Sequence, residues 1–294
     1  MDNAAAVRSA NLLGSLWMIA AMGIFAIEDS LLKTSAAILP IGQVLIMFGM
    51  GGAAVFALLA RSQGQRLFTP DAVSRPMRIR MFFEVTGRLF YVIAIALTPL
   101  SAATVIVQAT PLVVVAGAAL IFGEKVGWRR WTAILIGLAG VVIIIQPGRD
   151  SFSALSILTV IGMLGFAGRD LASRAAPASL GTNVLGFYGF LAVIVAGAIH
   201  FAVYGGAVWP NATTTAGLAM AVAAGVGAYT CLMRAMRTGE VSAVTPFRYT
   251  RLLFGIGLGM AVFGERLTGP MVLGSSLIVL SGMFIMWRGR VVPE

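Results

Sequence analysis

Apolar residues collect in ten long runs along the chain, and short polar segments separate the runs. The runs cover residues 12–27, 41–60, 81–97, 102–122, 131–145, 155–168, 183–204, 214–233, 241–263 and 271–287. A helix needs about 20 mainly apolar residues to cross the hydrocarbon core of a bilayer. The shorter runs are therefore expected to extend into the polar residues beside them. The pattern predicts an all-α integral membrane protein with ten transmembrane helices.

The composition agrees with a chain embedded in lipid. Of its 294 residues, 59% are apolar and 11% are charged, which is too few charges to cover a water-soluble domain of this size. The net charge of +10 is not interpreted as a nucleic-acid footprint, because the ten runs leave no soluble domain to carry one. Arg8 is the only basic residue before the first run and nine runs follow it, so we expect a retained helix and not a cleaved signal peptide.

The basic residues predict the orientation in the membrane. With the N-terminus inside, 15 of the 21 Lys and Arg residues fall in inner segments, three in outer loops and three within runs. Basic residues accumulate on the cytoplasmic side of membrane proteins. We therefore expect a multi-pass protein with both termini in the cytoplasm.

The chain also contains an internal repeat. Phe122-Gly123-Glu124-Lys125 returns as Phe263-Gly264-Glu265-Arg266, and the same shift of 141 residues maps Asp29 onto Asp170 and Ser101 onto Ser242. This predicts two five-helix repeats, residues 1–148 and 149–294. Because five is an odd number, the second repeat must enter the membrane from the opposite side. Inverted repeats of this kind place a substrate site near the bilayer midplane and give alternating access around it.

At this point the chain resembles the drug/metabolite transporter superfamily, and within it the ten-helix exporters of the EamA type. The residues that carry the resemblance are Pro99-Leu100-Ser101-Ala102, Pro111, the two Phe-Gly-Glu motifs, Arg129-Arg130-Trp131, Gln146-Pro147-Gly148 and Ser242-Ala243-Val244-Thr245-Pro246-Phe247. The resemblance covers roughly residues 10–290. It implies export of small metabolites, often amino acids, across the bacterial inner membrane.

Charged residues inside the runs are the first candidates for a substrate site, because such residues are costly in a membrane. The third run carries Glu84 and Arg88, and the ninth carries Arg248 and Arg251. In one interpretation, Glu84 neutralises some of these arginines in a buried network that joins the third and ninth helices. In the other, an arginine faces the cavity and binds a substrate carboxylate, which matches the planar guanidinium.

Prolines and aromatic residues complete the candidate site. Pro111 and Pro246 are expected to kink the fourth and ninth helices, and Gln108 and Thr110 could supply polar contacts there. The aromatic candidates for the apolar wall of the cavity are Trp17, Tyr91, Phe166, Tyr229, Phe247 and Tyr249. Packing in the core or against lipid is the alternative for each of them.

Asp29 and Asp170 occupy equivalent positions in the two repeats. Each has a basic residue four positions later, Lys33 and Arg174, so we expect i, i+4 ion pairs. Proton coupling is the alternative for the two carboxylates.

No nucleotide-binding, hydrolase or metal-ligand motif occurs in the sequence. We therefore expect no catalytic residue, no cofactor and no metal, and a protein that is not an enzyme. The expected partners are a small-molecule substrate and the lipid bilayer, without nucleic acid; the oligomeric state stays open, with a monomer as the simplest case.

Together these features predict a secondary transporter that exports small metabolites across the inner membrane by alternating access around a central cavity. Amino acids are the first choice of substrate, including aromatic or other apolar ones. The alternatives are export of other metabolites or drugs, and a membrane sensor that does not transport.

Overall fold

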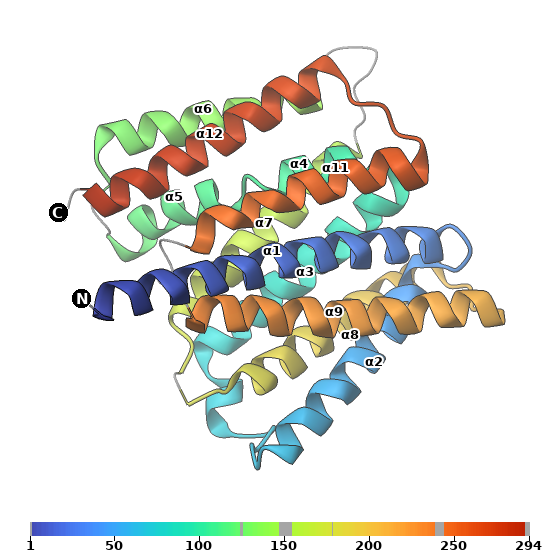
Figure 1. Ribbon diagram of the computed structural model, residues 1–294. Helices are drawn as coiled ribbons and strands as arrows, with labels where there is room; N and C mark the ends of the chain where they lie inside the picture. The colour runs from blue at the N-terminus through green and yellow to red at the C-terminus, as the bar shows by residue number, and fades with distance from the viewer. Residues whose placement is uncertain (1, 124–125, 147–154, 178, 239–243, 292–294) are drawn as a thin grey trace. The chain divides into compact units, whose positions relative to one another are not determined.

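The computed structural model confirms an all-α membrane fold. It describes residues 2–123, 126–146, 155–177, 179–238 and 244–291, and no β-strand occurs within these ranges. In the first half of the chain the α-helices are α1 (Asp2–Ala36), α2 (Ile41–Ser62), α3 (Arg75–Leu97), α4 (Leu100–Val107), α5 (Thr110–Phe122) and α6 (Trp128–Ile145) (Figure 1). In the second half they are α7 (Ser156–Arg174), α8 (Thr182–Tyr204), α9 (Ala212–Thr238), α11 (Thr250–Phe263) and α12 (Gly269–Val291). Two 3₁₀ segments are also present, η1 (Pro70–Val73) and η2 (Thr245–Tyr249).

These elements match the ten predicted runs. Six segments of the described chain are long and apolar enough to cross a membrane by length and composition alone. The fourth run is divided between α4 and α5, and the ninth contains η2 and α11. The two helices that begin the repeats continue beyond the predicted ends of their runs. Thus α1 reaches Ala36, and its part beyond residue 27 includes three charged residues, Glu28, Asp29 and Lys33.

The fourth transmembrane segment is interrupted where Pro111 follows Thr110. Pro111 lacks the N–H group that would bond the carbonyl of Val107 in a continuous helix. The Thr110 hydroxyl donates a hydrogen bond to that carbonyl instead, so the freed acceptor is satisfied inside the protein, as a membrane requires. In the ninth run, the 3₁₀ segment η2 contains Pro246 and leads directly into α11. The sequence prediction is confirmed near Pro111, where the helix is broken, and the kink near Pro246 stays a prediction.

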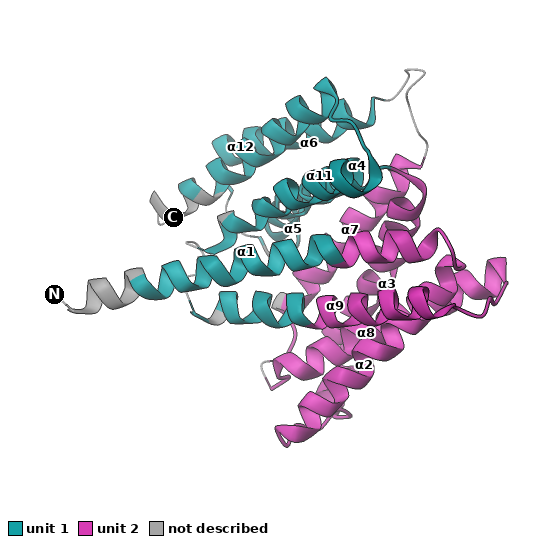
Figure 2. Ribbon diagram, turned by 45° about the vertical axis from the view of Figure 1, so that its right-hand side comes forward, with its two compact units in different colours: residues 1–27, 99–152, 227–294 teal, residues 28–98, 153–226 magenta. Residues whose placement is uncertain are grey.

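The helices group into two compact units, each containing parts of both predicted repeats (Figure 2). Unit 1 consists of Met1–Ile27, Pro99–Phe152 and Gly227–Glu294, and unit 2 of Glu28–Thr98 and Ser153–Val226. Within unit 1, α6 packs along α12 and α4 along α11; within unit 2, α2 packs along α8 and α3 along α7. The shift of 141 residues relates α2 to α8 and α6 to α12, so equivalent helices of the two repeats pack together. The division of the chain at residues 148 and 149 stays a prediction about sequence repeats.

Close approach of the paired helices depends on glycine. A β-carbon built on Gly42 of α2 would lie 2.7 Å from the backbone nitrogen of Phe201 in α8. One built on Gly140 of α6 would lie 2.7 Å from the carbonyl oxygen of Gly274 in α12. Small residues at helix interfaces allow this backbone contact in membranes.

The repeated Phe-Gly-Glu motif ends a helix in both repeats. Gly123 and Gly264 have positive φ angles of 68° and 63° at the ends of α5 and α11, a left-handed conformation that glycine adopts without strain. In unit 1 the Glu265 carboxylate accepts hydrogen bonds from the backbone nitrogens of Leu100 (2.6 Å) and Ser101 (2.9 Å) and from the Ser101 hydroxyl (2.6 Å). It therefore caps the N-terminus of α4, where backbone N–H groups lack partners within the helix. Glu124, the equivalent residue, lies outside the described residues.

Replacing Glu265 by alanine should lower the free energy of unfolding by about 2 kcal/mol, because the cap and its charged hydrogen bonds are lost. Thermal unfolding of the protein in detergent, followed by circular dichroism, measures the change. Arg266→Ala is the control, since Arg266 is exposed beside the cap and its removal should change stability by less than about 0.5 kcal/mol. Equal stability of the two variants would contradict the capping role of Glu265.

Candidate functional site

The predicted site residues fall into two groups, one in each compact unit. Unit 2 contains Glu84, Arg88 and Tyr91 on α3 and Phe166 on α7. Unit 1 contains the remaining candidates, which are Trp17, Gln108, Thr110, Pro111, Tyr229, Pro246, Phe247, Arg248, Tyr249 and Arg251.

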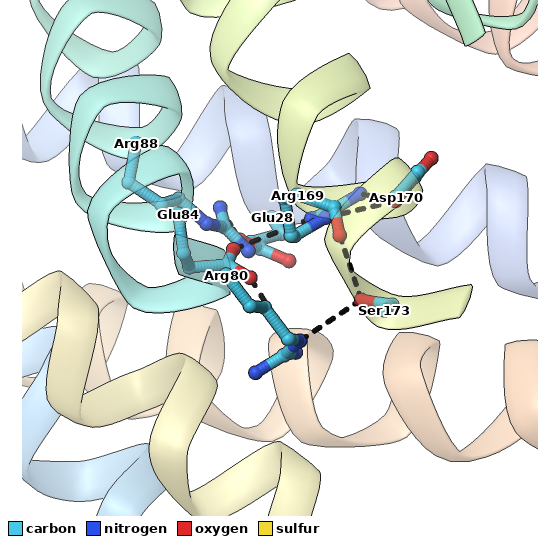
Figure 3. Close-up of polar contacts among 7 residues, drawn as sticks. All are labelled: Glu28, Arg80, Glu84, Arg88, Arg169, Asp170 and Ser173. Carbon is cyan, nitrogen blue, oxygen red and sulfur yellow. Dashed lines mark hydrogen bonds and ion pairs between the residues drawn. The ribbon is translucent and has the colours of Figure 1, made fainter. Parts of the chain in front are cut away.

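In unit 2, Glu84 is the centre of an ion-pair network between α3 and α7 (Figure 3). Its carboxylate lies 3.5 Å from Nη2 of Arg80 and 3.3 Å from Nη1 of Arg169. Arg169 also pairs with Asp170 at 2.8 Å, and Nε of Arg80 donates to the Ser173 hydroxyl at 3.0 Å. The Glu84 side chain is 5% exposed, so these cations neutralise a buried charge. The ion pairs of Glu84 thus join α3 to α7, a link that the sequence analysis did not propose.

Arg88 has a partner that the sequence analysis missed. Its Nη1 lies 2.9 Å from Oε1 of Glu28 on α1, and the Glu28 side chain is fully buried. The first apolar run ended at residue 27, and the sequence analysis did not consider Glu28, the residue that follows it. A usable signal was the acidic residue immediately after a long apolar run, followed by more helix-compatible sequence up to Lys33.

Glu28 and Asp170 change the charge balance around α3. The sequence analysis considered one carboxylate, Glu84, beside three arginines, Arg88, Arg248 and Arg251. In the structure, the three carboxylates of Glu28, Glu84 and Asp170 accompany three guanidinium groups, those of Arg80, Arg88 and Arg169 (Figure 3). This cluster is therefore neutral as a whole.

Asp29 and Lys33 both contact α3. The Tyr91 hydroxyl donates to Oδ2 of Asp29 at 2.9 Å, and both residues are 1% exposed. Nζ of Lys33 donates to the carbonyl oxygens of Ile95 (2.7 Å) and Thr98 (2.6 Å) at the C-terminal end of α3, where a cation is favourable. The sequence analysis predicted an ion pair between Asp29 and Lys33 and did not foresee these contacts of the two side chains with α3. In the second repeat, Asp170 pairs with Arg169, and the side chain of Arg174 lies outside the description.

The aromatic candidates of unit 2 contact one another and the network. The Tyr91 and Phe166 rings are 5.7 Å apart in an edge-to-face arrangement, and the Arg169 guanidinium lies 5.0 Å from the centre of the Phe166 ring. Three predicted residues, Glu84, Tyr91 and Phe166, are thus linked through Arg169 and the contact between the two rings.

In unit 1, a hydrogen bond joins the C-terminal end of α4 to η2. Nε2 of Gln108 donates to the carbonyl oxygen of Arg248 at 2.9 Å. Tyr249 is 7% exposed, and its hydroxyl is buried without a hydrogen-bond partner in the part of the chain that the structure describes. The Thr104 hydroxyl on α4 is in the same situation among these residues. Buried hydroxyls without a partner are unfavourable in a protein interior, and a bound polar ligand would satisfy them.

Two arginines of unit 1 lie over aromatic rings of α1. The Arg251 guanidinium is 5.2 Å from the centre of the Phe25 ring, and that of Arg234 is 5.0 Å from the centre of the Trp17 ring. Of the other candidates, Tyr229 and Pro111 are half-buried, Phe247 is 36% exposed, and the side chain of Pro246 lies outside the description. Contact of these residues with a substrate stays a prediction.

A separate small cavity of about 200 Å³ lies in unit 2 near the α2–α3 and α7–α8 connections. Arg66, Asp71, Ser179 and Val184 are among the residues that line it, and the Ser179 hydroxyl donates to the Asp71 carboxylate. None of the predicted site residues lines this cavity. Among the described residues, no group of three His, Cys, Asp or Glu side chains is arranged to hold a metal ion.

Ten membrane-spanning segments in two repeats define the class of inverted-repeat membrane transporters. The chain belongs to the EamA-like transporter family, whose sequence profile matches residues 12–146 and 154–287. The resemblance to the drug/metabolite transporter superfamily is thereby confirmed.

Relatives within this family are named for different substrates. The chain is 26% identical over 285 residues to a riboflavin transporter of Vibrio cholerae, with 93% of each chain covered. It is 27% identical over 275 residues to the pseudopaline exporter CntI of Pseudomonas aeruginosa, covering 91% of this chain and 94% of the relative. It is 23% identical over 212 residues to an S-adenosylmethionine uptake transporter of Rickettsia bellii, covering 71% and 70%.

A crystal structure with 20% sequence identity has the same fold. Its TM-score is 0.64, and the match covers 95% of this chain and 98% of the other.

Proposed function

We propose that this transporter exports small zwitterionic or anionic metabolites, with amino acids as the leading class, across the bacterial inner membrane. Aromatic and other apolar amino acids are included. Transport proceeds by alternating access, without ATP, as a secondary transporter. The excess of basic residues in the inner segments supports cytoplasmic termini.

The observation that carries the proposal is the presence of arginines within membrane-spanning segments that are otherwise apolar. Arg88 lies on α3, Arg248 in η2 and Arg251 at the start of α11. Ionisable residues at such depth are rare and mark substrate pathways, and arginine binds carboxylates with two parallel hydrogen bonds. Family membership alone does not select amino acids, because the relatives are named for riboflavin, pseudopaline and S-adenosylmethionine. The arginines favour a substrate with a carboxylate.

The proposal is tested by transport in proteoliposomes. Vesicles containing the purified protein are loaded with each of the twenty amino acids, and efflux is measured with and without a proton gradient. Efflux of at least one amino acid above that from protein-free vesicles is expected. Absence of efflux for all twenty would overturn amino-acid export.

Arg251→Ala should reduce the apparent affinity for the transported amino acid about ten- to hundredfold, because one charged hydrogen-bonding partner of its carboxylate is lost. The amount of protein inserted should not change, as measured by the protein content of the vesicles. Arg129→Ala is the matched control, since Arg129 is an exposed arginine at the start of α6. Unchanged affinity in the Arg251 variant would remove Arg251 from the substrate site.

A further inference from the structure

The ion pairs of unit 2 form two sets, and Glu28 with Arg88 makes up one of them. Arg80, Glu84, Arg169 and Asp170 form a set with two positive and two negative charges, joined by their own ion pairs. Glu28 and Arg88 pair with each other at 2.9 Å. If this pair is separated, no charge of the other set loses its partner.

The surroundings of the pair in unit 2 are closely packed on the Glu28 side and more accessible on the Arg88 side. A β-carbon built on Gly225 of α9 would lie 3.3 Å from Oε2 of Glu28 and 2.9 Å from Cζ of Phe48 on α2. The Glu28 side chain is fully buried, whereas that of Arg88 is 16% exposed. Arg88 is therefore the more accessible of the two side chains.

Arg88 also has unused hydrogen-bonding capacity. Its Nη1 donates to Glu28, while its Nε is buried without a hydrogen-bond partner within the described part of the chain. A guanidinium group carries five N–H donors in a planar arrangement and can bind a carboxylate through two of them. Arg88 can thus hold a second carboxylate without leaving its position on α3.

A buried ion pair is a poor device for stability alone. Removing two charges from water costs several kcal/mol per ion, and apolar residues of similar volume are often as stabilising or more so. Inside a membrane the same pair is a candidate functional site.

We propose that Glu28 and Arg88 together form the binding site for the charged groups of a zwitterionic substrate. Arg88 binds the substrate carboxylate and Glu28 binds the substrate ammonium group. This inference rests on the proposed amino-acid transport and adds the residues that recognise the two charges. It follows from the arrangement of the two charges, because a zwitterion placed between these side chains offers its carboxylate to Arg88 and its ammonium group to Glu28.

The same arrangement of charges predicts selectivity. A simple carboxylic acid would satisfy Arg88 but would place a second negative charge beside Glu28. A simple amine would place a second positive charge beside Arg88. Each should bind more weakly than the amino acid, since like charges in a medium of low polarity repel strongly.

The experiment uses the full-length protein in proteoliposomes and the amino acid with the highest efflux in the panel. Uptake by counterflow is measured in competition with the unlabelled amino acid, the amine obtained by removing its carboxylate, and the acid obtained by removing its amino group. In the wild-type protein the amino acid should compete at concentrations at least about tenfold lower than either analogue, corresponding to 1.4 kcal/mol or more.

Charge-neutral variants reverse this order. Glu28→Gln should weaken competition by the amino acid and strengthen competition by the acid, because the repelling carboxylate is gone. Arg88→Gln should weaken competition by the amino acid and strengthen competition by the amine, because the repelling guanidinium is gone. Asp170→Asn is the matched control; it neutralises an ion-paired carboxylate of unit 2 and should keep the wild-type order.

A gain in competition by one analogue is expected only if the pair binds the ligand. If the pair were only structural, its loss would weaken competition by all three ligands together. Equal competition by the three ligands in the wild-type protein would overturn the inference even if no variant folds. An unchanged order in Glu28→Gln would also overturn it, while efflux of the amino acid itself would still support the proposed function.

Discussion

Replacing Glu84 by glutamine is expected to lower the free energy of unfolding by about 3–5 kcal/mol, the effect of breaking a buried ion pair by removing one partner. Glu84 neutralises Arg80 and Arg169 at the interface of α3 and α7. Arg169 keeps Asp170, but Arg80 loses the ion partner that the structure gives it while its own side chain is 7% exposed. Thermal unfolding in detergent, followed by circular dichroism, should show a large decrease in the midpoint temperature.

Two further variants separate charge from packing in this prediction. Arg80→Gln combined with Glu84→Gln removes the unpaired cation as well, so it should recover part of the lost stability. Thr86→Ala on the same helix removes a hydroxyl that bonds the carbonyl of Phe82 in its own helix, and it should change stability by less than about 0.5 kcal/mol. If the double variant is no more stable than Glu84→Gln alone, the unpaired charge of Arg80 is not the cause.

The membrane fold could be predicted from the sequence because its main determinants are local. Apolar runs of the right length require helices, since backbone polar groups must be satisfied within lipid. The helix break before Pro111 also follows from the sequence, because proline has no N–H group to donate a hydrogen bond to the carbonyl oxygen of Val107. The hydrogen bond from Thr110 to that carbonyl shows how the chain compensates one residue away.

Long-range partners could not be predicted in the same way. Glu28 is stabilised inside a helix by Arg88, 60 residues further along the chain, and a single sequence does not reveal which distant residue supplies the opposite charge. The search for charged candidates was confined to the apolar runs, and it therefore missed Glu28, which directly follows the first run. The hydrogen bond from Tyr91 to Asp29 was missed for the same reason, although both residues had been considered separately.

The assembly of the compact units is a second feature beyond the sequence analysis. The repeat shows which helices are equivalent, but it does not show that α2 packs along α8 or α6 along α12. Those contacts depend on the fit of side chains across interfaces where glycines admit a neighbouring backbone or ring. The 141-residue spacing of the repeat carries no information on how side chains fit together between two helices.

Replacing Gly282 by alanine should destabilise unit 1 by about 3 kcal/mol, at the upper end of the usual effect of overpacking. Gly282 lies on α12, and a β-carbon at this position would overlap the hydroxyl oxygen of Tyr249. Tyr249 is buried at the end of η2, so its ring cannot move into solvent to make room. The change should appear as a lower unfolding temperature in detergent and as reduced transport, because Tyr249 belongs to the predicted substrate site.

A matched glycine and a compensating substitution test the cause. Gly257 on α11 has nothing within 4 Å of a β-carbon built on it, so Gly257→Ala should be neutral or stabilising by about 0.5–1 kcal/mol through helix propensity alone. Tyr249→Ala introduced together with Gly282→Ala should remove the overlap, and the two substitutions should therefore be less damaging together than the sum of their separate effects. Additive effects would mean that the methyl group and the tyrosine ring do not compete for the same space, which would contradict the contact between α12 and η2 on which the prediction depends.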